Sequence, residues 1–247
     1  MDAGPETWLP GNVGGAWLRG NTLHRPTGPW TPAVHALLAH LAESGVPHVP
    51  RVLGFDEQGR ERLTFLPGRV VDVDTEMLTL AQLQALVTWT KGFHDAVVGF
   101  VHPGPWRYPS AEGSTLVGHN DIAPYNACFD GDHLVGVFDW DLASPTTPVL
   151  ELAFIAWNCV PLWRDIGDRG SAERILIICE SYGDVSPVEM LEAVPDRIRL
   201  MLDWIPSGAA EGDVGLCRLM KEGEPDRSQT ALDALLPRLS RMRGLLP

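Results

Sequence analysis

The sequence has few basic residues and no long apolar run, and each shortage excludes a class of protein. Nineteen lysine and arginine residues stand against 32 aspartate and glutamate residues, for a formal net charge of −13. We therefore expect no nucleic-acid partner, because binding to a phosphate backbone requires basic patches. No apolar stretch approaches the roughly 20 residues that cross a bilayer, so we expect no membrane association.

Cysteine is also scarce. The four cysteines are far apart and form no Cys-x-x-Cys pair: Cys128, Cys159, Cys179 and Cys217. This pattern is typical of buried free thiols in a reducing compartment. The N-terminal MDAGPETW is acidic and lacks the charged-then-apolar pattern of a signal peptide. These features predict a cytoplasmic location, and they leave the oligomeric state open.

The segment from Val117 to Asp141 carries the clearest chemical signal. It reads His119-x-Asp121, then four residues, then Asn126, then a short hairpin pattern and Asp139. Phosphoryl transfer from Mg-ATP needs a base that orients the acceptor hydroxyl. It also needs hard oxygen ligands for Mg²⁺, which an amide and a carboxylate provide. The order of these side chains therefore predicts a phosphoryl-transfer site.

The local pattern also predicts the geometry of this site. Residues 114–118 read as a buried strand, and NACF and LVGVF read as an antiparallel hairpin around Asp130-Gly131. The ends of a hairpin lie side by side, so Asn126 and Asp139 should meet at its mouth, with Asp121 on the preceding loop. The alternative is that these residues only close the hairpin and cap a turn.

Several motifs together indicate a family. They are HNDIAPYN (119–126), VFDWD (137–141) and PVLELAFIAW (148–157), with LPGNVGGAW (9–17), HRPTGPW (24–30) and FLPG (65–68) upstream. The sequence resembles the aminoglycoside phosphotransferase and choline kinase-like family of small-molecule kinases. The resemblance implies an α+β, two-lobed protein-kinase-like fold, with a small β-rich N-terminal lobe, a larger, mainly helical C-terminal lobe, and ATP in the cleft.

The same resemblance implies roles for four residues. Asp121 matches the catalytic base, and Asn126 and Asp139 match the Mg²⁺ ligands. His119 matches the histidine that braces the catalytic loop.

The chain divides at Leu66-Pro67-Gly68. Residues 1–67 are predicted as the nucleotide-binding lobe, with short strands and one helix that Thr31 caps and Gly45 ends. Residues 68–247 are predicted as the catalytic and acceptor-binding lobe. Its helices are expected over 79–98 and near 149–160, 171–182, 187–205, 213–221 and 228–244.

The nucleotide site is expected to use the N-terminal lobe. Backbone N–H groups of a glycine turn, at Gly14 and Gly15, can cradle phosphates, although such a turn also serves an ordinary hairpin. Arg25 is predicted as the phosphate-binding cation because it is always charged, with His24 as the alternative. Val34 or His35 stands where kinases carry its acidic partner, so this cation is expected to lack an anchor.

Further residues are expected to contact adenine, to support the catalytic loop or to lie in the core. Adenine should bind the backbone of the linker, at Thr64, Phe65 and Leu66. Glu151 is expected to tether the catalytic loop, and His94 to be a core histidine. Asp141 is expected either to support the metal or to cap a turn.

The resemblance implies a small-molecule acceptor with a hydroxyl group, and the catalytic residues do not distinguish aminoglycosides from choline-like alcohols or sugars. Acidic residues gather near a predicted loop, SGAAEGDVG: Asp203, Glu211, Asp213, Glu222, Glu224 and Asp226. Clustered carboxylates favour a cationic acceptor, and the alternative is a solvated face.

The sequence therefore predicts a small-molecule kinase that uses ATP and Mg²⁺. The alternative is a non-catalytic nucleotide-binding or regulatory protein of kinase-like fold, because of the missing acidic partner and the short stretch before Leu9. A protein kinase is disfavoured because no D-F-G or A-P-E segment follows Asn126.

Overall fold

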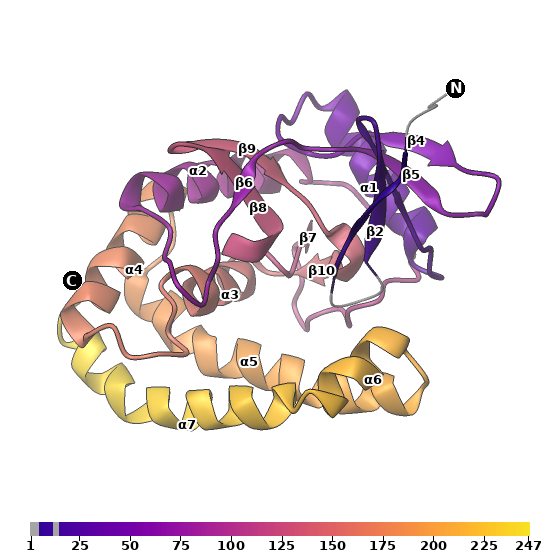
Figure 1. Cartoon of the computed structure of the whole chain (residues 1–247). Helices are drawn as coiled ribbons and strands as arrows, with labels where there is room; N and C mark the ends of the chain where they lie inside the picture. The colour runs from indigo at the N-terminus through magenta and orange to yellow at the C-terminus, as the bar shows by residue number, and fades with distance from the viewer. Residues whose placement is uncertain (1–4, 12–14) are drawn as a thin grey trace.

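An antiparallel sheet of five short strands forms the N-terminal part of the computed structural model, which describes residues 5–11 and 15–247. The strand order is β1-β2-β3-β5-β4. The bounds are Thr7–Leu9 (β1), Ala16–Arg19 (β2), Thr22–Arg25 (β3), Val52–Phe55 (β4) and Glu61–Thr64 (β5). Figure 1 shows this sheet at the N-terminal end of the molecule, beside helix α1 (Thr31–Glu43).

Helix α1 starts one residue earlier than its sequence predicts. Trp30 is the N-cap, so the expectation that Thr31 caps the helix is wrong. The Thr31 hydroxyl instead accepts a hydrogen bond from the Gly28 N–H at 2.9 Å, which fixes the turn before the helix. The apolar residues of one helix face are buried: Val34, Leu37, Leu38 and Leu41.

The linker after β5 lies tightly against the central hairpin. Strand β6 (Arg69–Val70) pairs with β8 (Ala127–Asp130), which pairs with β9 (His133–Val137). A Cβ added to Gly68 would lie 2.8 Å from the Cys128 Cβ, and one added to Gly136 would lie 2.4 Å from the Leu66 Cδ1. Glycine therefore permits the close approach that joins the N-terminal sheet to the hairpin.

The rest of the chain is mainly helical, as predicted. The helices are α2 (Leu80–Ala96), α3 (Pro148–Cys159), α4 (Asp168–Tyr182), α5 (Pro187–Ala210), α6 (Val214–Lys221) and α7 (Glu224–Arg243). A capping box between Thr79 and Gln82 starts α2. The fold class is therefore confirmed: a β-rich N-terminal part and a mainly helical C-terminal part.

The predicted loop SGAAEGDVG is largely helical. Helix α5 continues past Pro206 to Ala210, so residues 207–210 form its last turn. Close packing explains this: a Cβ added to Gly208 would lie 2.3 Å from the Leu216 Cδ1 of α6. Over the described ranges, no helix combines the length and the apolar character that crossing a bilayer requires.

Candidate active site

The loop that carries Asp121 has an unusual backbone. It follows β7 (Leu116–Gly118), which pairs with β10 (Ser144–Thr146). Asn120, with φ 62°, and Asp139, with φ 63°, both lie in the left-handed region. Asn and Asp tolerate this region better than most residues. Such backbone geometry is concentrated at functional sites, where the surrounding structure holds it in place.

His119 joins the two segments that carry the carboxylates. Its Nδ1 accepts a hydrogen bond from the Asp121 N–H at 3.2 Å, and its Nε2 lies 3.1 Å from the Phe138 carbonyl. An amide N–H only donates and a carbonyl only accepts, so the ring is neutral with its proton on Nε2. Burial lowers the pKa of His119, in agreement with the neutral form. These two contacts fasten the backbone of Asp121 to the residue before Asp139.

Asp121 contacts Asn126 directly. The Asn126 Nδ2 donates to the Asp121 Oδ2 at 2.8 Å, and the Tyr125 hydroxyl donates to Oδ1 at 3.2 Å. The Phe138 N–H donates to the Asn126 carbonyl at 2.9 Å, so the hairpin ends do lie side by side. Burial, and then the Asp139 carboxylate, raise the pKa of Asp121 to about 8. The structure thus brings Asp121, Asn126 and Asp139 together.

Arg25 points toward these carboxylates. Its Nη1 lies 3.4 Å from the Asp139 Oδ1, and its Nη2 lies 2.5 Å from the Asp141 Oδ1. His24 points the other way, with its Nδ1 2.8 Å from the Asp56 Oδ2. Arg25 is therefore the cation of β3 that faces the candidate site.

The expectation that this cation lacks an acidic partner is wrong. Glu61 lies directly opposite Arg25 in the β3–β5 ladder, with its Oε1 3.0 Å from the Arg25 Nε. Its other oxygen, Oε2, lies 2.7 Å from the His35 Nε2 on α1. The acidic partner thus comes from strand β5, and helix α1 contributes His35, which contacts the same carboxylate. Alternation with the buried Leu63 along β5 was the available sequence signal for a buried Glu61.

A second arginine extends the charge network, which the sequence did not reveal. Arg107 lies 3.7 Å from the Asp141 Oδ2 and binds both oxygens of Asp213, at 2.8 and 2.7 Å. Asp213 also caps α6, accepting from the Leu216 N–H at 3.0 Å. Asp141 is therefore an ion-pair partner of Arg25 and Arg107, and this pairing links it to α6.

Two buried side chains, Glu151 and His94, support the loop that carries Asp121. The Glu151 Oε1 accepts from the Asn120 N–H at 2.6 Å, and Oε2 lies 2.6 Å from the His94 Nε2. The His94 Nδ1 lies 2.8 Å from the Tyr182 hydroxyl. Burial raises the pKa of Glu151, but the His94 and Asn120 contacts outweigh it and leave it below the ordinary value. The tether and the core histidine are both confirmed.

Arg197 of α5 is a further support that the sequence did not reveal. Its side chain is almost fully buried, at 1% exposure. It donates to the Asn120 carbonyl and to the Tyr108 hydroxyl, each at 2.7 Å. The guanidinium also lies over the Phe154 ring, 4.3 Å from its centroid. It fixes the residue immediately before Asp121.

The glycine turn expected to contact the phosphates lies only partly within the described residues. Gly14 lies outside the described residues. Gly15 has φ 64°, and a Cβ there would lie 2.4 Å from the Trp8 ring, so glycine is required. Arg218 of α6 donates to the Gly11 carbonyl at 3.2 Å, which brings α6 beside this turn.

In the linker, backbone groups are already bonded within the protein. The Thr64 N–H donates to the Arg51 carbonyl at 3.0 Å, and the Phe65 N–H donates to the Asn21 carbonyl at 2.9 Å. The Leu66 carbonyl accepts from the Gly68 N–H at 3.1 Å. A purine at this linker would therefore have to use other atoms of these residues or share these bonds.

Arginines neutralise part of the acidic cluster predicted to bind the acceptor. Besides the pairing of Asp213 with Arg107, Glu222 pairs with Arg218 and Glu224 pairs with Arg227, each at 2.7 Å. Three of the six acids thus have a basic partner.

Three of the four free cysteines are buried as predicted, and Cys217 is half-buried.

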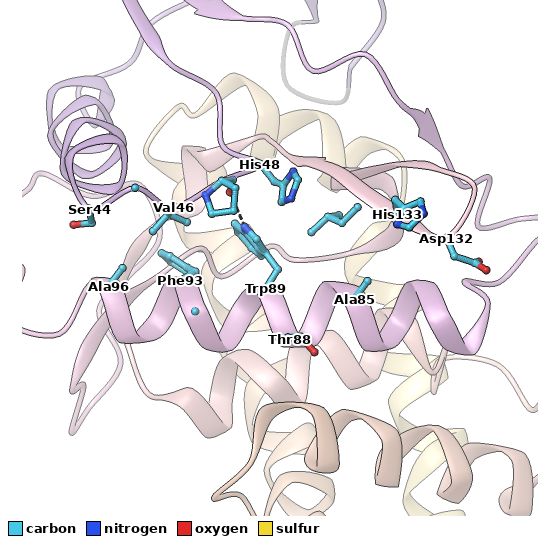
Figure 2. Close-up of a pocket in the computed structure, with 14 residues that line it drawn as sticks. Ser44, Val46, His48, Ala85, Thr88, Trp89, Phe93, Ala96, Asp132 and His133 are labelled. Atoms are coloured by element: carbon cyan, nitrogen blue, oxygen red, sulfur yellow. Dashed lines mark hydrogen bonds between the residues drawn. The ribbon is translucent and has the colours of Figure 1, made fainter.

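A cavity of about 670 Å³ lies away from the candidate site at Asp121, Asn126 and Asp139. It opens between α2, the turn of the β8–β9 hairpin and the segment after α1, as Figure 2 shows. The Trp89 indole N–H donates to the Pro47 carbonyl at 2.8 Å and fastens that segment to α2. None of the candidate catalytic or metal-binding residues lines this cavity.

Comparison with known proteins agrees with the fold. The model of the phosphotransferase enzyme family, APH, matches residues 104–189, which contain the candidate catalytic loop and hairpin. The trifolitoxin immunity protein of Rhizobium leguminosarum bv. trifolii is 33% identical over 182 residues, covering 67% of this chain and 69% of that protein. The chain belongs to the APH phosphotransferase family.

Solved structures share the fold at low sequence identity. Amicoumacin kinase hAmiN, in complex with AMP-PNP, Ca²⁺ and Ami, matches with a TM-score of 0.65 and 13% identity, over 98% of this chain and 89% of that one. A choline/ethanolamine kinase family protein from Mesorhizobium loti matches with a TM-score of 0.60 and 14% identity, over 98% and 93%. The gentamicin complex of APH(2")-IIa matches with a TM-score of 0.61 and 12% identity, over 95% and 93%.

Proposed function

We propose that this phosphotransferase is a small-molecule kinase that transfers the γ-phosphoryl group of Mg-ATP to a hydroxyl of its acceptor. One observation carries the proposal. The Asp121 carboxylate is bonded to the Asn126 amide at the mouth of a hairpin whose other end carries Asp139. This is the base and oxygen-ligand set that phosphoryl transfer needs, in one place.

Each side chain of the site has its own proposed role, as the base or as a metal ligand. Asp121 accepts a hydrogen bond from the acceptor hydroxyl and finally takes its proton. The Asn126 amide nitrogen is committed to Asp121, so the amide oxygen is the end available to a metal. Asp139, with its side chain 44% exposed, supplies a carboxylate oxygen. These are hard ligands that suit Mg²⁺, which neutralises the β- and γ-phosphates when bound with ATP.

Arg25 is the proposed phosphate-binding cation. Glu61 fixes its Nε, which leaves the outer nitrogens directed at Asp139 and Asp141. The phosphates would compete for those outer nitrogens, while Glu61 keeps the guanidinium in place. Bidentate guanidinium geometry is well matched to phosphate oxygens.

In this proposal, residues 1–67 hold the nucleotide, with Gly14, Gly15 and the linker at Thr64–Leu66, and residues 68–247 hold the acceptor. Most of the rate arises from positioning and electrostatics, with no covalent intermediate on the enzyme. We also propose a cytoplasmic location, which suits the four free cysteines.

An acceptor with an amine as well as its hydroxyl, such as an aminoglycoside, remains our proposal for the substrate class. It is supported by the net charge of −13 and by three acids of the C-terminal region: Asp203 on α5, Glu211 at the C-cap of α5 and Asp226 on α7. Its affinity should fall as salt rises, because partly exposed charge pairs are screened.

Calorimetry and a transfer assay test the proposal. Mg-ATP should bind, and binding should weaken with ATP in chelator. Label from γ-labelled ATP should then be followed into a panel of amino and neutral hydroxyl compounds, with trifolitoxin included because of the relative's name, at low and high salt. Selective transfer to a neutral alcohol, indifferent to salt, would overturn the amine part alone.

A further inference from the structure

The Tyr125 hydroxyl occupies the oxygen of Asp121 that the proposed reaction needs. The Asn126 amide takes Oδ2 at 2.8 Å, and the same amide donates to the Asp121 carbonyl at 3.0 Å. The Oδ2 atom is therefore already occupied by a hydrogen bond that holds Asp121 against Asn126. Oδ1 accepts only from the Tyr125 hydroxyl among the donors of residues 5–11 and 15–247, at 3.2 Å. An acceptor hydroxyl must bond to Oδ1, where the phenol now lies.

Tyr125 can leave this position without disturbing the turn that carries it. Its neighbours Pro124 and Asn126 are buried, and the turn is closed by the Asn126 N–H to the Ala123 carbonyl at 3.0 Å. Tyr125 itself is 40% exposed. The Asp121 carboxylate oxygen accepts, so the phenol donates through its O–H. A side-chain rotation would break one hydrogen bond and free Oδ1.

We infer that Tyr125 is a positioning residue that closes Asp121 to water until the hydroxyl of an acceptor replaces the phenol. The inference rests on the proposed kinase function. A water bonded to Oδ1 could attack ATP: its oxygen bonds to the γ-phosphorus, the bridging Pβ–O–Pγ bond breaks, ADP leaves, and the water proton passes to Asp121. With the phenol on Oδ1, that water has no base. An acceptor that packs on the exposed ring displaces the phenol and supplies its own hydroxyl.

Tyr125→Phe tests this, because it keeps the ring and removes only the hydroxyl. ATP hydrolysis without any acceptor should rise roughly tenfold, the upper end of the range for removing one ordinary hydrogen bond. Adding Asp121→Asn to the variant should abolish the rise, which shows that it runs through Asp121. A gain of hydrolysis cannot come from a damaged fold. Thr90→Val is the control: it removes a buried hydroxyl that donates to the Leu86 carbonyl within α2, and hydrolysis should not change.

A nucleotide-free measurement complements the assay. In a crystal structure of Tyr125→Phe, a water should lie within hydrogen-bonding distance of the Asp121 Oδ1. Unchanged hydrolysis and no such water, with Mg-ATP binding intact, would overturn the inference and leave the kinase assignment standing. Label recovered on Tyr125 itself by peptide mapping would also overturn it, because the phenol would then be an acceptor. Failure of the unaltered protein to bind Mg-ATP would overturn both.

Discussion

Glu61 faces Arg25 across the β3–β5 ladder, with 3.0 Å between the Glu61 Oε1 and the Arg25 Nε. The acidic partner of Arg25 therefore comes from a strand. Helix α1 has no acid at Val34 or His35, and its His35 contacts the other oxygen of Glu61. The guanidinium is thereby held at one edge, and its remaining nitrogens point at Asp139 and Asp141. A cation fixed in this way is suited to meet phosphates without losing its position.

Replacement of Glu61 should therefore weaken both the fold and nucleotide binding. Glu61→Gln removes a charge that is only 3% exposed, and the free energy of unfolding should fall by about 1–3 kcal/mol. Affinity for Mg-ATP should fall because Arg25 turns more fully toward Asp139 and Asp141. Urea unfolding and calorimetry measure the two effects. Glu57→Gln, the same change at an exposed position of the neighbouring turn, should alter neither, and equal effects of the two variants would contradict the role of Glu61.

The metal ligands should respond separately from the base. Asp139→Ala should remove the dependence of nucleotide binding on Mg²⁺, and Asn126→Ala should weaken binding, because each removes one hard oxygen ligand. Calorimetry with Mg-ATP, against ATP in chelator, measures this. Equal metal-independent binding by both variants and the unaltered protein would refute the ligand assignment.

Gly118 should not tolerate a side chain. A Cβ there would lie 2.4 Å from the Glu151 Oε2, which is bonded to His94, and 2.5 Å from the Thr146 Cγ2. Gly118→Ala should therefore destabilise the protein by about 1–3 kcal/mol and slow phosphoryl transfer, because it displaces the tether of Asn120. Gly170→Ala is the matched control. It lies inside α4 with nothing near the added Cβ, so stability should be unchanged or slightly higher. A loss of stability at Gly170 equal to that at Gly118 would argue against the tether.

The Arg107–Asp213 pair should make stability depend on pH in the acid range. Burial raises the pKa of Asp213, but the hydrogen bonds from Arg107 outweigh it and hold the pKa below the ordinary value of 3.8. A lowered pKa contributes stability that is complete above 3.8 and is lost as pH falls through the folded value. Asp213→Asn should thus cost stability at pH 7, and the difference from the unaltered protein should shrink toward pH 3. A stability difference between the variant and the unaltered protein that grows as pH falls would contradict a lowered pKa of Asp213.

The sequence predicted the part of the site that is local along the chain. His119, Asp121, Asn126 and Asp139 lie within 21 residues, and a hairpin pattern alone brings their ends together. The tether at Glu151, on α3, was predicted from the family resemblance of the segment that contains it.

The remaining contacts depend on packing between distant segments. Glu61 meets Arg25 only because β3 and β5 pair in one particular register. Arg107 meets Asp213, 106 residues further along, and Arg197 reaches the Asn120 carbonyl from 77 residues away. No local pattern specifies such pairs. The segment SGAAEGDVG was predicted as a loop, but the packing of Gly208 against Leu216 keeps its first residues in α5.

The most direct test of the account is γ-phosphoryl transfer by the unaltered protein and by Asp121→Asn, measured side by side with labelled ATP and the acceptor panel. The account predicts labelled product from the unaltered protein. It predicts a loss of about 10²–10⁴-fold in Asp121→Asn, with Mg-ATP affinity changed no more than a few-fold. Near-normal transfer by Asp121→Asn would contradict the assignment of the base. Tight Mg-ATP binding with no label in any acceptor, from either protein, would contradict catalysis itself and favour a nucleotide-binding protein without transfer activity.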